Sequence, residues 1–132
     1  MKKPYVAVAL VAASALALSA CANNSGAAST SSSTAAGGVS LVSPGNLTVC
    51  THLSYKPFQF TEGGTIVGFD VDVMDLVAKK LGVTQQVIDI EFGQITSGAV
   101  FTAKKCDVGA AAITITPERE QAAPFSDPYF AS

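Results

Sequence analysis

The stretch Val108-Gly-Ala-Ala-Ala-Ile-Thr-Ile-Thr-Pro-Glu-Arg119 joins an apolar run, predicted to be a strand over residues 107–113, to the start of a short helix. Thr116 is a suitable N-cap residue, and Pro117 suits the first helical position. The unpaired backbone N–H groups at a helix start, next to the guanidinium of Arg119, favour a planar anion such as a carboxylate. A helix cap with a surface arginine is the simpler interpretation of this motif when it is taken alone.

Around this stretch, strands and helices alternate in the predicted secondary structure. The predicted strands are 47–51, 86–91 and 107–113, with a small hairpin of 59–61 and 65–69, and the predicted helices are 70–81, 95–103 and 117–122. Residues 123–129 are predicted to begin another strand or an extended crossing segment. A β-α-β-α-β order implies parallel strands with helices on the faces of the sheet. The predicted fold class is therefore α/β with a mostly parallel sheet.

The helix predicted over residues 70–81 carries an apolar stripe. Its members recur at the spacing i, i+3, i+4 and i+8, which predicts the buried face: Val73, Leu76, Val77 and Leu81. Asp70 and Asp72 are interpreted as caps of the helix start. Phe58 and Phe60, which precede the helix, are predicted core residues.

The first residues indicate export. Lys2 and Lys3 precede the apolar run Val6–Leu18, and this run of thirteen residues is too short to span a bilayer about 30 Å thick. Residues 1–21 are therefore predicted to be a signal peptide. Leu18-Ser-Ala-Cys21 resembles a bacterial lipobox, which implies that Cys21 is lipidated and anchors the chain outside the cytoplasm. An ordinary cleavable signal that contains Cys21 is the alternative.

Composition divides the rest of the chain. Residues 22–38 contain only Ala, Asn, Ser, Gly and Thr, so a flexible tether is predicted over residues 22–44 and a folded domain over residues 45–132. The whole chain has 8 Lys and Arg against 10 Asp and Glu, a net charge of −2. No basic patch for nucleic acid is present in the sequence.

Two further cysteines, Cys50 and Cys106, suggest a disulfide in an exported protein. Their predicted places argue against it, because Cys50 lies late in one strand and Cys106 at the start of another, whereas a bond needs Cα atoms within about 7 Å. Two buried free thiols are the alternative. His52 is the only histidine, so the spacing does not fit a zinc site, and we predict no metal and no cofactor.

Four motifs, in this order, resemble those of the extracellular solute-binding proteins of ABC importers, in the branch that binds polar amino acids. The motifs are Thr51-His-Leu-Ser-Tyr-Lys-Pro-Phe-Gln-Phe60, Val67-Gly-Phe-Asp-Val-Asp72, Ile113-Thr-Ile-Thr-Pro-Glu-Arg119 and Phe125-Ser-Asp-Pro-Tyr129. The resemblance covers residues 47–132 and implies one lobe of a type 2 periplasmic-binding-protein fold. Members of this family have two lobes, so we expect this chain to be the first lobe only, truncated before the second.

The resemblance also implies a ligand site. Arg119 would bind the ligand's carboxylate, helped by the hydroxyl of Thr114, and the carbonyl of Ala112 would accept from its ammonium. Tyr55 and Phe92 would pack on both sides of the ligand's side chain. Ordinary core packing is the alternative for both aromatic residues.

His52 departs from the pattern of many relatives, which carry an acidic residue at this position. A neutral imidazole both donates and accepts, so we expect His52 to favour a polar or acidic ligand, such as glutamine or glutamate, over a strongly cationic one, unless it is a loop residue without a ligand contact. The implied function is capture of an amino acid for an ABC permease, not enzymatic. An inert or regulatory one-lobe protein is the alternative, and a dehydratase of aromatic amino-acid precursors is less favoured, because no paired carboxylates occur on the cleft side.

Overall fold

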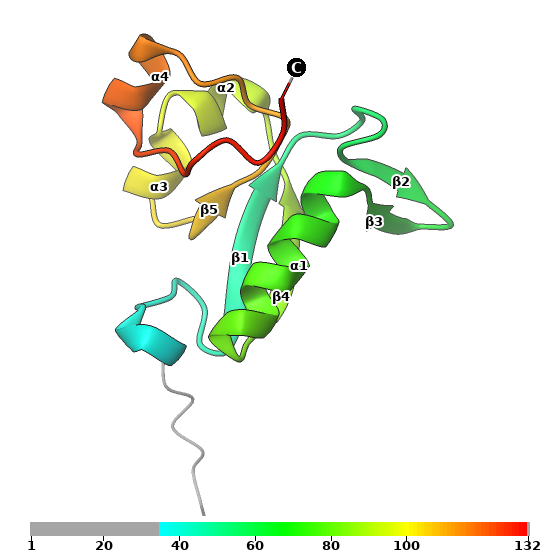
Figure 1. Cartoon of the computed structure of the whole chain (residues 1–132), viewed down its shortest axis with the longest axis vertical. Helices are drawn as coiled ribbons and strands as arrows, with labels where there is room; N and C mark the ends of the chain where they lie inside the picture. Colours follow the sequence, from blue (N-terminus) through cyan, green and yellow to red (C-terminus); the bar gives the residue numbers. More distant parts are fainter. Residues whose placement is uncertain (1–34, 132) are drawn as a thin grey trace, which may run out of the picture.

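The computed structural model describes residues 35–131 of the 132-residue chain (Figure 1). The predicted signal peptide, the lipobox at Cys21 and most of the predicted tether lie outside the described residues. Within the described range, no helix has both the length and the apolar character that crossing a bilayer requires.

A three-stranded parallel sheet lies at the centre, in the order β4-β1-β5. It is formed by β1 (Asn46–Thr51), β4 (Thr84–Asp89) and β5 (Val108–Gly109). β1 pairs with β4 along its whole length, whereas β5 contributes only two pairs, Val49 with Val108 and Cys50 with Gly109. The predicted α/β class with a parallel sheet flanked by helices is confirmed. The strand predicted over residues 107–113 is much shorter than expected.

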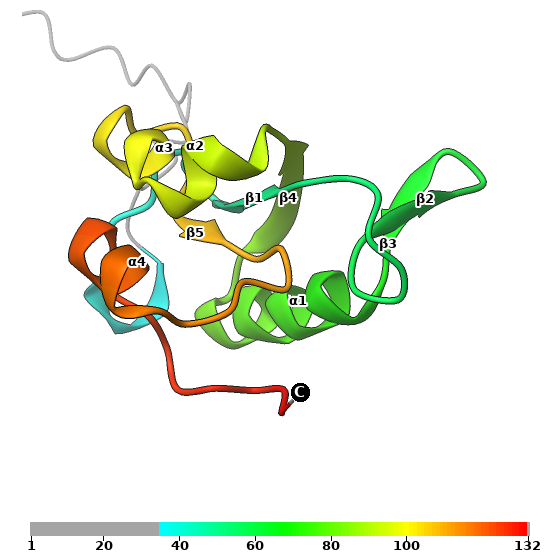
Figure 2. The same ribbon diagram turned by 90° about the horizontal axis from the view of Figure 1, so that it is seen from above.

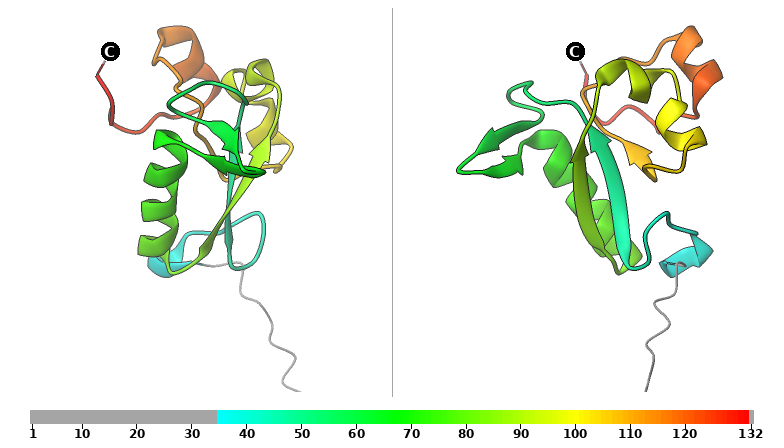
Figure 3. Two further views of the ribbon diagram at one scale, coloured as in Figure 1. Left: turned by 90° about the vertical axis from the view of Figure 1, so that its right-hand side faces the viewer. Right: turned by 180° about the vertical axis from the view of Figure 1, so that it is seen from behind.

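Helices cover both faces of this sheet (Figure 2). The longest, α1 (Phe69–Leu81), lies on one face, and α2 (Phe92–Thr96) and α3 (Ala99–Thr102) lie on the other. A fourth helix, α4 (Pro117–Ala122), follows the end of β5. The hairpin of β2 (Phe60–Glu62) and β3 (Thr65–Val67) projects from the body of the molecule (Figure 3), and a 3-10 turn, η1 (Ala36–Gly38), precedes β1.

The helix predicted over residues 95–103 is divided in two at Gly98. Gly98 has φ +74°, in the left-handed region that glycine adopts without a steric penalty. A side chain at this position would place its Cβ 2.5 Å from the carbonyl oxygen of Ala122. Gly98 therefore both ends α2 and lets the end of α4 approach α3.

The two faces of the sheet have separate cores. The α1-side core consists of Ala35, Leu41, Leu47, Val49, Met74, Ala78 and Ala110. The α2–α3-side core consists of Cys50, Ile95, Val100, Cys106 and Ala111. Because successive side chains of a strand point to opposite faces, Val49 of β1 belongs to the first core and Cys50 to the second.

The buried face of α1 differs from the predicted stripe. Met74 and Ala78 are buried, Val73 and Leu81 pack beside them, and Leu76 is 66% exposed. Val77 is also exposed, so the prediction is wrong for two of its four residues. The central line of the buried face runs through Asp70, Met74 and Ala78, and a carboxylate and a small side chain on this line weaken the hydrophobic signal that periodicity detects.

Residues 35–44 pack against the folded unit although composition assigns them to the tether. Ala35 and Leu41 are buried in the α1-side core. The backbone N–H of Val42 donates to Asp107 Oδ1 at 2.7 Å. The folded unit thus begins before residue 45, because Ala35 and Leu41 contribute to its core.

Candidate functional site

The predicted site residues lie where the chain leaves the carboxyl ends of β1 and β5, the edge at which open α/β sheets bind ligands. β5 ends at Gly109, and Ala112 adopts φ +48°, which no regular strand allows. The break explains why the apolar run to residue 113 does not continue as a strand. It turns the chain toward Thr114 and the start of α4.

The start of α4 is as predicted. Thr116 is the N-cap, its hydroxyl accepts from the backbone N–H of Arg119 at 3.3 Å, and Pro117 is the first helical residue. The cap fixes the backbone of Arg119 relative to the turn after β5. Arg119 itself is half-buried, so part of its guanidinium remains accessible.

The guanidinium of Arg119 is held without a carboxylate. Its Nη1 donates to the carbonyl oxygen of Thr114 at 2.8 Å, and its Cζ lies 5.4 Å from the ring centroid of Phe92. Between residues 35 and 131, the only ion pair joins Lys79 and Asp75 on the surface of α1. Arg119 therefore presents a positive charge on an aromatic face, and an anion is the complementary ligand.

His52 lies next to Phe92, with ring centroids 6.4 Å apart. Its Nδ1 is 3.0 Å from the carbonyl oxygen of Ile90. A carbonyl only accepts, so Nδ1 must carry the hydrogen and Nε2 of the neutral ring is an acceptor. Gln59 Nε2 donates to the backbone carbonyl of His52 at 3.1 Å and fixes this loop from the other side.

We call His52, Phe92 and Arg119 the Arg119 group. Phe92 also packs against the α2–α3-side core. Its ring therefore has both a core contact and a contact with the guanidinium of Arg119. In contrast, Tyr55 is 56% exposed and its ring stacks on Phe58 at a centroid distance of 5.5 Å. Core packing is therefore excluded for Tyr55.

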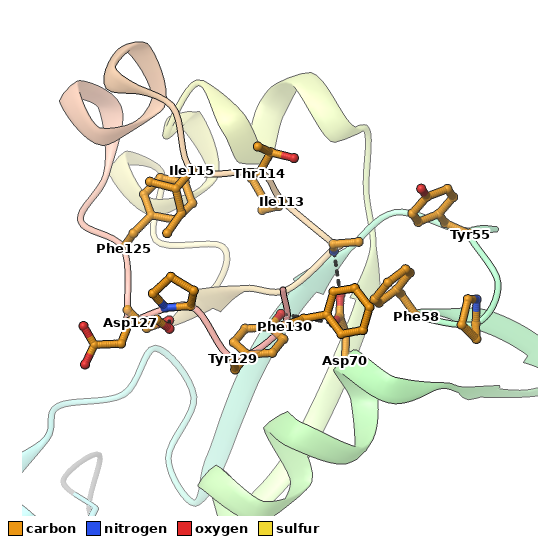
Figure 4. Close-up of a pocket in the computed structure, with 14 residues that line it drawn as sticks. Tyr55, Phe58, Asp70, Ile113, Thr114, Ile115, Phe125, Asp127, Tyr129 and Phe130 are labelled. Atoms are coloured by element: carbon orange, nitrogen blue, oxygen red, sulfur yellow. Dashed lines mark hydrogen bonds between the residues drawn. The ribbon is translucent and has the colours of Figure 1, made fainter. Parts of the chain in front are cut away.

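Tyr55, Ala112 and Thr114 line a cavity of about 570 Å³ (Figure 4). Its other lining residues are Pro57, Phe58, Asp70, Ile113, Ile115, Phe125, Ser126, Asp127, Pro128, Tyr129 and Phe130. The Arg119 group lies outside this cavity, and Arg119 lines a neighbouring cavity of about 530 Å³. Thr114 connects the two, because it lines the first cavity and its carbonyl accepts from Arg119.

Of the two aromatic residues predicted as core, Phe58 lines the cavity and Phe60 does not. Phe58 is half-buried and contacts Tyr55, Phe69 and Phe130, and Phe60 is half-buried with Lys56 Nζ 4.6 Å from its ring centroid. Neither belongs to the two cores. The prediction is wrong because the chain has only a small sheet, and its two faces are filled by aliphatic residues of β1, α1 and α2.

Sequence reasoning missed Asp70 and Tyr129. Asp70 is 1% exposed, and the N-cap of α1 is Gly68 without a side-chain cap, so Asp70 does not have the predicted capping role. Its Oδ2 accepts from the backbone N–H of Ala112 at 2.6 Å, and its Oδ1 accepts from the hydroxyl of Tyr129 at 3.0 Å. Burial raises the pKa of Tyr129 above its ordinary value, and the charge of Asp70 and the hydrogen bond to it raise that pKa further. Both residues belong to motifs that carry the family resemblance, which was the available signal.

In the structure, Cys50 and Cys106 form a disulfide with Cα atoms 5.8 Å apart. The positional objection does not apply, because Cys106 lies before β5 and the backbone N–H of the next residue, Asp107, donates to the carbonyl of Thr48 in β1 at 2.9 Å. The loop after α3 thus returns to the middle of β1. Among residues 35–131, no group of three or more His, Cys, Asp or Glu side chains is placed to hold a metal ion.

This geometry defines the class of the protein: an α/β lobe that carries an arginine at the carboxyl edge of its sheet. Residues 47–132 match the bacterial extracellular solute-binding proteins, family 3, and the chain belongs to this family.

Among its relatives, the chain is 38% identical over 84 residues to the arginine-binding extracellular protein ArtP of Bacillus subtilis, covering 64% of this chain and 32% of ArtP. It is 35% identical over 134 residues to a probable histidine-binding protein of Neisseria gonorrhoeae, covering 97% of this chain and 44% of the relative. One further relative is an enzyme, the cyclohexadienyl dehydratase of Pseudomonas aeruginosa, 34% identical over 90 residues, which are 67% of this chain and 33% of the enzyme.

Among solved structures, the arginine-bound form of domain 1 from TmArgBP matches with a TM-score of 0.61 and 41% identity, over 65% of this chain and 68% of that chain. The chain spans a third to less than half of the length of the relatives named above. The chain therefore covers a larger share of the single-domain structure than of the whole relatives.

Proposed function

We propose that this chain binds a free amino acid through its α-carboxylate, with Arg119 as the principal anion-binding group and Thr114 as its neighbour. The observation that carries the proposal is the half-buried guanidinium of Arg119, which rests on the Phe92 ring and has no carboxylate partner among residues 35–131. A charge-assisted bond between a guanidinium and a carboxylate is stronger than a neutral hydrogen bond. The hydrogen bond from Arg119 Nη1 to the backbone carbonyl of Thr114 orients the guanidinium before the ligand arrives.

The other groups of the ligand would lie along the same edge. The carbonyl of Ala112 is proposed to accept from the ammonium, and the exposed ring of Tyr55 to contact the ligand's side chain from the side opposite Phe92. Both Ala112 and Tyr55 line the cavity that reaches Thr114. A single domain of a relative, TmArgBP, has been solved with arginine bound, which supports binding by one lobe.

His52 sets the proposed preference for the ligand's side chain. In the neutral ring, Nδ1 is committed to the carbonyl of Ile90, so only the acceptor Nε2 remains for a ligand. An acceptor favours a side chain that donates, which fits the amide of glutamine and also a guanidinium or imidazole. This proposal departs from the expectation drawn from the sequence, which favoured a polar or acidic ligand over a strongly cationic one, because the carboxylate of glutamate lacks such a donor. The names of the relatives, arginine-binding and probable histidine-binding, support a donating side chain.

Calorimetric titration with L-glutamine, L-arginine, L-histidine and L-glutamate tests this proposal. We expect the donating amino acids to bind with dissociation constants of about 1 mM or tighter, and glutamate more weakly. Arg119→Ala should remove binding, Arg119→Lys should retain part of it, and Lys79→Ala, which removes a cation from the surface of α1, should change nothing. Equal affinity of Arg119→Ala and wild type would refute the proposed site.

In the cell, we propose that the protein presents its amino acid to an ABC importer outside the cytoplasm and that a lipid on Cys21 anchors it to the membrane. Family membership supports the first part, and the Leu18-Ser-Ala-Cys21 motif supports the second. Cys21→Ser should release the chain from the membrane fraction or leave it unprocessed. Equal membrane association of both forms would contradict the anchor.

We also propose that the chain is not an enzyme, although one relative is a dehydratase. A dehydratase needs a general acid poised over its substrate. Asp70 and Asp127 are the carboxylates that line the cavity, and both oxygens of Asp70 already accept hydrogen bonds from protein groups. Turnover of a cyclohexadienyl substrate by the purified chain would overturn this assignment.

A further inference from the structure

Asp70 is a buried carboxylate that is stabilised by hydrogen bonds and not by a cation. It is 1% exposed, and no Lys, Arg or His between residues 35 and 131 forms an ion pair with it. Burying an ionised carboxylate is unfavourable unless its oxygens are hydrogen-bonded. Here each oxygen has one donor, the N–H of Ala112 at 2.6 Å and the hydroxyl of Tyr129 at 3.0 Å.

The first of these donors belongs to a residue in an unusual conformation. Ala112 has φ +48°, in the left-handed region that non-glycine residues rarely adopt. Such a conformation persists only when the surrounding contacts determine it. The bond to Asp70 Oδ2, between residues 42 positions apart in sequence, is a contact of this kind. Two residues later, Thr114 accepts from Arg119, so the turn that Asp70 holds is continuous with the proposed carboxylate site.

The second donor comes from a different part of the chain. Tyr129 belongs to the irregular segment after α4 and lies 59 positions from Asp70 in sequence. Its ring centroid lies 6.0 Å from that of Phe69, and the next residue, Phe130, contacts both Phe69 and Phe58. Figure 4 shows Asp70 between Tyr129 and the segment after β5 that carries Ile113 and Thr114. Asp70 therefore joins the start of α1, the turn after β5 and the segment after α4.

We propose that Asp70 is a positioning residue for amino-group recognition: it holds Ala112 in the left-handed conformation and thereby directs the Ala112 carbonyl to the ammonium of the ligand. Tyr129 donates to the other carboxylate oxygen, Oδ1, and so satisfies Asp70 on the side that does not contact Ala112. This proposal rests on the proposed function, in which Ala112 accepts from the ammonium. Asp70 does not contact the ligand, and its effect is confined to ligands that carry an α-amino group.

Asp70→Leu tests the proposal, because leucine is close to aspartate in size and shape but has no atom that accepts a hydrogen bond from Ala112 or Tyr129. Affinities are measured for L-glutamine and L-arginine and for the deaminated analogue of each, in which hydrogen replaces the amino group. We expect Asp70→Leu to weaken both amino acids by about 10-fold or more and to leave the deaminated analogues nearly unchanged. Equal weakening of amino acids and analogues, or no weakening, would overturn the proposal.

A second measurement uses the chain without ligand. The three-bond coupling between the amide and α protons of Ala112 reports its φ, and the amide proton shift reports the bond to Asp70. Asp70→Leu should change both, Tyr129→Phe should leave the coupling unchanged, and Asp72→Leu, on an exposed acidic residue of the same helical turn, should change neither. An unchanged Ala112 φ in Asp70→Leu refutes the role of Asp70. If wild type binds none of the probes, the proposed function fails, and the coupling still decides whether Asp70 holds Ala112.

Discussion

The two faces of the sheet are stabilised in different ways. On one face, the thirteen-residue helix α1 packs Met74 and Ala78 on Leu47 and Val49. On the other, α2 and α3 have five and four residues and are separated by Gly98, and the disulfide lies within their core. Helices this short have little stability of their own. The face that positions Phe92 therefore depends on a covalent link, whereas the α1 face depends on apolar burial.

Removal of the disulfide should change the stability of the molecule most, and it should act on the α2–α3 face. Cys50 and Cys106 are 56 residues apart, and closing such a loop stabilises the folded state by about 4 kcal/mol in the chain-entropy model. The double variant Cys50→Ser, Cys106→Ser should lower the free energy of unfolding by up to this amount. The loss should be seen first as weaker protection of α2 and α3 amides in hydrogen exchange.

Thiol counting provides the control. In a Cys21→Ser background, the chain denatured without reductant should show no free thiol. Labelling of two thiols per chain would contradict the bond, and the α2–α3 face would then have to be stable through packing alone.

The second effect concerns the α1 face. Met74 is 8% exposed and Leu76 is 66% exposed, although the sequence pattern placed Leu76 in the buried stripe. Met74→Ala should cost about 2–4 kcal/mol of unfolding free energy, whereas Leu76→Ala should change it by less than about 0.5 kcal/mol. Chemical denaturation of the two variants measures both values. A larger loss of unfolding free energy in Leu76→Ala than in Met74→Ala would mean that α1 is rotated from its described orientation.

A smaller effect is expected from Tyr129, which joins the start of α1 to the segment after α4. Because burial and the charge of Asp70 raise its pKa, folding favours the protonated phenol. Its contribution, about 1 kcal/mol, is fully present below the unfolded tyrosine pKa of about 10 and is lost as the pH rises through the folded pKa. The stability difference between wild type and Tyr129→Phe should thus shrink from pH 8 to pH 11. A difference that is constant or grows with pH would contradict the bond to Asp70.

The elements that the sequence predicted well are those set by local signals. β1 is a short apolar run after Pro44-Gly45, α1 ends before Gly82 in the left-handed conformation, and α4 starts with the Thr116 cap and Pro117. These features depend on neighbouring residues only, so propensity and capping suffice to find them.

The elements that it missed depend on contacts between distant residues. β5 ends at Gly109, before Ala112, which has a left-handed φ and donates its N–H to Asp70, and α2 and α3 separate where Gly98 meets the carbonyl of Ala122. For the site, the motifs predicted Arg119 and Thr114 as ligand-binding residues. The donor and acceptor roles of the His52 nitrogens follow only from the bond of Nδ1 to the carbonyl of Ile90. No pattern along the chain encodes these pairings.

The central claim is that Arg119 and Thr114 form the core of an amino-acid site, and an amide chemical-shift titration with L-glutamine and L-arginine tests it most directly. We predict shift changes centred on residues 114–119 and on Tyr55 and Phe92, saturating with one ligand per chain and absent in Arg119→Ala. Changes that cluster away from Arg119, or that persist in Arg119→Ala, would show that the ligand binds elsewhere and that the assigned site is wrong.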